Sequence, residues 1–160
     1  MPNDENSPRD PAQLDDHERQ ILADVERVGW HIVIIEEDEI GPAYAFTVGL
    51  YHSFGHPEIA IVGLPYEVME GVLNDLGTDI QSRAAFDADR RYPGLLEGPY
   101  DCVFVEVPQT AYVENLGAAL WYYRDRPFPT LQCLWPDKNN LTPLDDDFDS
   151  RLRSRQPMMA

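Results

Sequence analysis

The residues best suited to chemistry lie in one short segment, Tyr51–Glu58, which reads YHSFGHPE. His52 and His56 carry imidazole groups, which titrate near neutral pH and act as general acids or bases. Together with the carboxylate of Glu58 they also offer the nitrogen and oxygen ligands that divalent metals bind. The glycine and the proline of the segment argue against a helix, so the spacing of the histidines does not place them on one face. The segment therefore predicts catalysis by His52 and His56.

Three other interpretations of the same segment stay open. A divalent metal held by His52, His56 and Glu58 is one alternative. Ser53 beside a histidine is a second, as a nucleophile that still needs an orienting carboxylate and oxyanion donors. The third is a tight connection whose histidines bind backbone groups or solvent.

Aromatic and polar residues later in the chain provide candidate ligand contacts. The segment Trp121–Arg126 joins three aromatic rings to two arginines. Such a group stacks on a planar ligand and pairs with a phosphate or carboxylate, which favours Tyr123 and Arg124 as binding residues. A helix end whose arginines complement the dipole is the competing interpretation. Gln132 lies within an apolar strand pattern, where its amide faces a ligand or hydrogen-bonds to neighbouring backbone.

Hydrophobic periodicity predicts the elements that must position these residues. Apolar positions spaced by seven, four and three predict a helix from about Asp15 to Val28, capped by Asp15 or Asp16 and ended by Gly29. Further predicted elements are strands over 30–35, 43–51, 58–64, 100–107 and the centre of 127–136, and helices over 65–77 and 112–123. A long loop is predicted over 78–98, with or without one helical turn. About five strands and three helices without regular alternation predict an α+β fold, with a small mixed or antiparallel sheet or a split-barrel-like core.

Length and composition predict one domain and limit its partners. A single domain is expected over residues 13–148, with a disordered N-terminal tail over 1–12 and a flexible C-terminal tail over 149–160. The net charge of −17 repels phosphate backbones and excludes nucleic acid as a partner class, whereas a basic protein fits it. No apolar run reaches the roughly 20 residues that a membrane span needs. Without an apolar leader at the N-terminus, the expected location is the cytoplasm.

Several long segments resemble the bacterial domain of unknown function 4262. They read GWHIVIIEEDEIGPAYAFTVGLYHSFGHPEIAIVGLP, YPGLLEGPYDCVFVEV and LGAALWYYRDRPFPTLQCLWPDKNN. The resemblance runs from about Gly29 to Phe148, and FTVGLYHSFGHPE and ALWYYRDRPFPTLQCLWPD are its most specific parts. It implies a widespread bacterial protein without an assigned reaction.

The order of strand, loop, strand and helix over 45–76 is similar to the split-barrel flavin reductases. That similarity implies a homodimer with FMN bound across it. Thr47, Val48, Gly49 and Leu50 would approach the cofactor, and Arg124 or Arg126 would bind its phosphate. A divalent metal is the other candidate cofactor. The phosphate-binding motifs GxGxxG and GxxxxGK[ST] do not occur in the sequence.

Three functions from different classes follow. The first is binding of a small ligand or cofactor, with or without catalysis, in a pocket lined by the His52/His56 loop and the Trp121–Arg126 segment; it requires these segments to converge. The second is a non-catalytic acidic adaptor or immunity protein. The third is a metal-dependent hydrolase. Whether the protein is an enzyme stays open at this stage.

Overall fold

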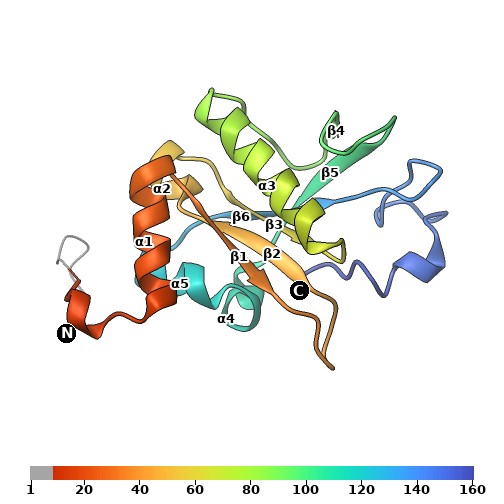
Figure 1. Ribbon diagram of the computed structural model, residues 1–160. Coiled ribbons are helices and arrows are strands. Elements are labelled where there is room, and N and C mark those ends of the chain that lie inside the picture. Colours follow the sequence, from red (N-terminus) through yellow and green to blue (C-terminus); the bar gives the residue numbers. More distant parts are fainter. Residues whose placement is uncertain (1–8) are drawn as a thin grey trace.

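The computed structural model describes residues 9–160, which form an open six-stranded mixed sheet (Figure 1). The strands are β1 (His31–Ile35), β2 (Tyr44–Val48), β3 (Glu58–Val62), β4 (Arg91–Pro93), β5 (Asp101–Glu106) and β6 (Thr130–Leu134), in the order β1-β2-β3-β6-β5-β4. Only the central pair, β3 and β6, is parallel; the other four pairs are antiparallel. The α+β class is confirmed, and the mixed sheet is the form that it takes.

Helices cover both faces of this sheet (Figure 1). The helices are α1 (Asp16–Val28), α2 (Leu50–Phe54), α3 (Tyr66–Gln81), α4 (Tyr112–Asn115) and α5 (Gly117–Tyr123), and the 3-10 turns are η1 (Pro11–Gln13), η2 (Gln109–Ala111) and η3 (Ser150–Leu152). Helix α3 lies on one face, and α1, α4 and α5 lie on the other. In the described residues, no helix has both the length and the apolar character that crossing a membrane requires.

Each face of the sheet carries its own apolar core, because side chains alternate along a strand. Ile59 and Ile61 of β3 point toward α3 and pack in the core that includes Leu73 and Leu76. Ala60, between them, belongs to the opposite core with Phe46 of β2. Glu58 precedes Ile59 and therefore points to the same side as Ala60, toward α5.

Helix α1 forms as its sequence predicts. The Asp15 side chain accepts a hydrogen bond from the N–H of Glu18, whose side chain in turn binds the N–H of Asp15. Gly29 ends the helix in the left-handed conformation at φ 107°, which residues with a side chain rarely adopt.

Three of the predicted boundaries differ from those of the structure. Helix α3 continues past Gly77 to Gln81, because this glycine makes room for a ring: a Cβ there would lie 2.5 Å from Trp30. The predicted loop 78–98 holds a helical turn, as one form of the prediction allowed, and this turn is the end of α3. The loop also contains the short strand β4, which was not predicted. The histidine segment begins with a helix, α2, which Gly55 ends at φ 69°.

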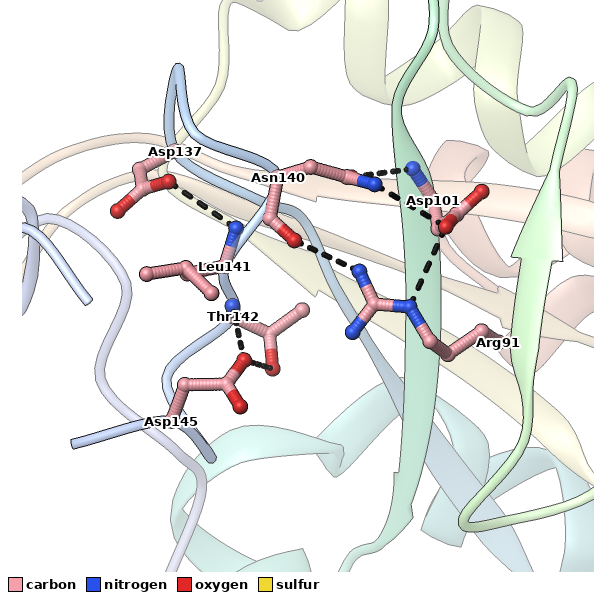
Figure 2. Close-up of polar contacts among 7 residues, drawn as sticks. All are labelled: Arg91, Asp101, Asp137, Asn140, Leu141, Thr142 and Asp145. Carbon is pink, nitrogen blue, oxygen red and sulfur yellow. Dashed lines mark hydrogen bonds and ion pairs between the residues drawn. The ribbon is translucent and has the colours of Figure 1, made fainter. Parts of the chain in front are cut away.

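The chain after β6 is fixed to the β4–β5 edge of the sheet. Figure 2 shows the side chain of Asn140 bound to Asp101, with the N–H of Asp101 donating to Oδ1 at 2.8 Å and Nδ2 donating to the carboxylate at 3.1 Å. Arg91 donates to both the Asp101 carboxylate and the Asn140 carbonyl. Asp137 accepts backbone N–H groups of Asn139, Leu141 and Asp149. These contacts hold the chain beyond residue 137 against the strands.

The last residues return to the middle of the sheet (Figure 1). Gln156 exchanges two hydrogen bonds with the backbone of Trp135, at 2.7 and 2.9 Å. Gln132 donates to the carbonyl of Pro157 and accepts from the N–H of Met159. The flexible tail predicted for 149–160 makes these contacts, and its mobility in solution stays a prediction. Of the predicted N-terminal tail 1–12, residues 1–8 lie outside the described part.

Candidate functional site

The centre of the candidate site is the carboxylate of Glu58, which is only 1% exposed. Five donors from one short stretch of chain and one helix satisfy its two oxygens. Oε1 accepts from Thr47 Oγ1 at 2.8 Å and from the N–H of Leu50 at 3.1 Å, and Oε2 accepts from the N–H groups of Gly49 and Tyr51 and from the Tyr123 hydroxyl. The three N–H groups are those left open at the start of α2. Glu58 therefore caps α2 from the adjacent strand.

Tyr123 extends this network to α5. Its hydroxyl donates to Glu58 and accepts the N–H of His52 at 3.1 Å. Its ring stacks on Phe128 with a centroid separation of 4.5 Å. Burial raises the pKa of Tyr123, as does the nearby carboxylate of Glu58, so the hydroxyl keeps its proton. Burial also raises the pKa of Glu58, and the bonds from Tyr123 and Thr47 offset only part of that. The network fixes α5 and α2 at one end of the sheet.

A cavity of about 640 Å³, named here the His52 cavity, opens beside this network. The last turns of α1 form one wall with Val25, Glu26, Arg27 and Val28. The rest of the lining includes His52, Ser53 and Phe54 of α2, Tyr122 of α5 and Gln81 of α3.

The His52 ring belongs to this cavity. It meets Tyr122 edge-on with a centroid separation of 5.9 Å. Among the described residues, neither the ring of His52 nor the hydroxyl of Tyr122 has a hydrogen bond to the protein. Both groups are therefore available to a ligand.

A second cavity, also of about 640 Å³ and named here the His56 cavity, lies on the other side of Phe54. The end of α3 and the segment 83–88 line it, together with Glu106 at the end of β5. Phe54 and Gln81 line both cavities. The two histidines of the YHSFGHPE segment thus face neighbouring cavities with a partition between them.

His56 is engaged on both ring nitrogens. Nδ1 donates to the carbonyl of Pro57 at 2.8 Å, and Nε2 accepts the N–H of Phe86 at 3.0 Å. This pair of contacts fixes the neutral tautomer with its proton on Nδ1. A general base needs a free nitrogen, so catalysis by His56 would first have to break one of these bonds. In the structure the ring ties the segment after α3 to the start of β3.

Acid is expected to weaken the fold through His56. Burial lowers the pKa of His56 from its ordinary value of 6.5, and the bonds to Pro57 and Phe86 offset only part of this. A lowered pKa means that the unfolded chain takes up a proton before the native chain does. The stability contribution is therefore complete above pH 6.5 and is lost as the pH falls, by up to about 1.4 kcal/mol per pH unit.

Urea denaturation between pH 7.5 and 5 measures this effect by comparison with His56→Gln. The glutamine still offers an amide oxygen to the Phe86 N–H but does not titrate. The difference in free energy of unfolding between the two proteins is expected to shrink in acid. If the free energy of unfolding changed with pH in the same way in both proteins between pH 7.5 and 5, the role assigned to the neutral His56 ring would be contradicted.

The metal and serine interpretations do not fit the geometry. His52, His56 and Glu58 do not converge: the first is exposed, the second faces Phe86 and the third is buried with both oxygens in use. Across residues 9–160, no group of three or more His, Cys, Asp and Glu side chains is placed to hold a metal. Ser53 Oγ donates to the carbonyl of Gly29 at 2.8 Å, and no histidine nitrogen contacts it.

The residues predicted to approach FMN do not fit that cofactor either. Thr47, Val48 and Leu50 are fully buried. The hydroxyl of Thr47 and the N–H groups of Gly49 and Leu50 are directed at Glu58, so they leave no donor for a flavin. Arg124 adopts the left-handed conformation just after α5, at φ 54°.

Arginine side chains contact the end of α5, in agreement with the interpretation of this segment as a helix end complemented by arginines. Arg126 Nε donates to the carbonyl of Tyr123 at 3.2 Å. Arg9, which the sequence alone did not single out, donates to the carbonyls of Trp121 and Tyr122. Its guanidinium lies 4.0 Å from the centroid of the Trp121 ring.

The structure brings together some of the predicted site residues and separates others. Thr47, Gly49 and Tyr123 meet at Glu58, with the backbone of His52 beside them. His56 faces the neighbouring cavity, and the amide of Gln132 is occupied by the C-terminal segment. From the sequence, Glu58 was predicted only as a possible metal ligand. The available signal for a buried anchor was a carboxylate at the start of the apolar run EIAIV.

The comparisons with known proteins give a family. The family model described as "Domain of unknown function (DUF4262)" matches residues 24–149, which include the Glu58 network and most of the residues around both cavities. No curated protein and no solved structure matches this chain.

Proposed function

This chain belongs to the DUF4262 family, whose description gives no function, and we propose from its geometry that it binds a small ligand in the His52 cavity. One observation carries the proposal. Two segments about seventy positions apart, at His52 and at Tyr122, meet at one cavity, and the buried Glu58–Tyr123 network behind them holds both in place. Binding sites are most effective when such a supporting layer fixes the contacting groups.

The lining suits a ligand with an apolar body and a few polar groups. Val25, Val28 and Phe54 provide apolar surface, whereas the His52 ring and the Tyr122 hydroxyl provide polar groups that have no hydrogen bond to residues 9–160. A volume of about 640 Å³ is within the range of small-molecule sites. The proposed role is binding, and a reaction is not part of the proposal. The hydroxyl of Ser53, which lines this cavity, donates to the carbonyl of Gly29, and no histidine nitrogen contacts it.

A fragment screen tests this function, with binding detected as shifts of the protein's amide NMR signals. Fragments that bind are expected to shift the amides of His52, Ser53 and Tyr122 more than those elsewhere. His52→Ala and Tyr122→Phe are expected to weaken the best fragment about tenfold, equivalent to about 1.4 kcal/mol. Tyr66→Phe, at an exposed tyrosine outside the cavity, is the matched control.

Hits that all map to other surfaces, or no hit at these amides, would overturn the proposal. Equal loss of affinity in Tyr66→Phe would show that the effect is not specific to the cavity.

For location we propose the cytoplasm. Cys102 and Cys133 are both buried free thiols, and free thiols are typical of proteins kept in a reducing compartment.

A further inference from the structure

Two long helices end at the His52 cavity. Helix α1, of 13 residues, ends at Val28, and helix α3, of 16 residues, ends at Gln81; both residues line the cavity. The C-terminal end of a helix carries roughly half a negative charge and favours a cation within about one turn. The helix ends therefore make this part of the molecule more favourable for a cation than for an anion.

The last turn of α1 also has unused acceptors. The carbonyls at the end of a helix lack partners within it. The carbonyl of Val25 accepts the N–H of Gly29, and that of Gly29 accepts Ser53 Oγ. In the described part of the chain, no N–H or O–H group donates to the carbonyl oxygens of Glu26, Arg27 and Val28. These residues line the cavity.

Charged and aromatic side chains of the cavity agree with this polarity. Glu26 adds a carboxylate, and Phe54 and Tyr122 add aromatic rings, whose faces attract cations. Arg27 is the arginine of the lining, and its guanidinium is paired with Asp24 at 3.3 Å. The net charge of −17 adds a long-range field that draws cations toward the molecule.

The adjoining end of α5 already binds a cation within the chain. The guanidinium of Arg9 donates to the carbonyls of Trp121 and Tyr122 at 3.0 and 2.9 Å. It also lies over the Trp121 ring at 4.0 Å. Helix-end carbonyls beside an aromatic ring thus bind a cation in this protein. The His52 cavity offers the same two components, carbonyls at a helix end and aromatic rings.

We propose that the His52 cavity selects organic cations, namely an ammonium, amidinium or guanidinium group carried on a small apolar or aromatic body. The cationic group would donate to the open carbonyls at the end of α1 and pair with Glu26. The apolar body would lie against Phe54 and Tyr122. This inference rests on the proposed function and adds the class of ligand to it.

Three near-isosteric probes separate the ligand class from the site. Benzamidine is cationic, benzamide neutral and benzoate anionic, and all three are titrated into the full-length protein while amide NMR signals are recorded. Benzamidine is expected to shift the amides of Ser53 and Tyr122 and to bind at least about tenfold more tightly than the other two. Glu26→Gln is expected to remove most of that preference, whereas Glu114→Gln, at an exposed carboxylate on α4, is expected to leave it unchanged.

Each contrary result has a distinct meaning. Benzamide or benzoate binding at the same amides as tightly as benzamidine would overturn the cation class and leave the cavity as a site. Benzamidine shifting only residues around Trp121, by displacing Arg9, would overturn the assignment to this cavity. An unchanged preference in Glu26→Gln would overturn the proposed pairing. No response at these amides to any probe or screened fragment would overturn the proposed function as well.

Discussion

Glu58→Ala is expected to lower the free energy of unfolding by about 4 kcal/mol, among the largest effects of any single substitution in this chain. The alanine removes the carboxylate that accepts from five donors: the buried N–H groups of Gly49 and Leu50, the partly buried N–H of Tyr51, and the hydroxyls of Thr47 and Tyr123. Each buried donor left without a partner costs about 1–3 kcal/mol, offset where water enters. Urea denaturation followed by circular dichroism measures the change.

A loss of this size is a large share of the stability of an ordinary domain, so a milder variant keeps the test decisive. Tyr123→Phe removes one hydroxyl from the network and is expected to cost about 2 kcal/mol, since the lost bond is to a carboxylate. Tyr122→Phe is the matched control at the next position. Its hydroxyl has no bond to the described protein, so the expected change is below about 0.5 kcal/mol. An equal loss in free energy of unfolding in Tyr123→Phe and Tyr122→Phe would contradict the role assigned to the Tyr123 hydroxyl in the network.

The parts of the fold that were predictable are those set by local pattern. The apolar spacing of α1, its cap at Asp15 and its end at Gly29 all lie within one stretch of sequence. The β-branched runs of β1 and β3 are similarly local signals. Gly77 was interpreted as a helix end because glycine commonly has that role; its real cause, the Trp30 ring packed against it, comes from a residue 47 positions away.

The sequence predicted which residues belong to the candidate site better than it predicted their interactions. The types and positions of His52, Thr47, Gly49 and Tyr123 pointed to one region, and most of them meet there. Their hydrogen bonds depend on Glu58 pointing toward α5, which follows from strand pairing that no local pattern encodes. His56 lies four positions from His52 but on the other side of Phe54, because Gly55 ends the intervening helix and turns the chain.

The C-terminal residues illustrate the same limit, because their partners are distant in sequence. Gln132 was ambiguous between a ligand contact and a backbone contact, and its partners, Pro157 and Met159, are about 25 positions away in a segment without periodic pattern. At Gly63, a Cβ would lie 1.9 Å from the carbonyl oxygen of Arg155. The absence of a side chain there lets the returning chain approach β3 closely.

Deletion of residues 156–160 is expected to lower the free energy of unfolding by about 3 kcal/mol. It removes both bonds between Gln156 and the Trp135 backbone, and it leaves the fully buried amide of Gln132 without its two partners. The unpaired amide of Gln132 accounts for much of this loss. Gln132→Leu is therefore expected to lower the free energy of unfolding less in the shortened chain than in the full chain. A double-mutant cycle by urea denaturation is expected to give a coupling of about 1 kcal/mol or more. A shortened protein as stable as the full chain would show instead that this segment is a mobile tail, as its composition alone predicts.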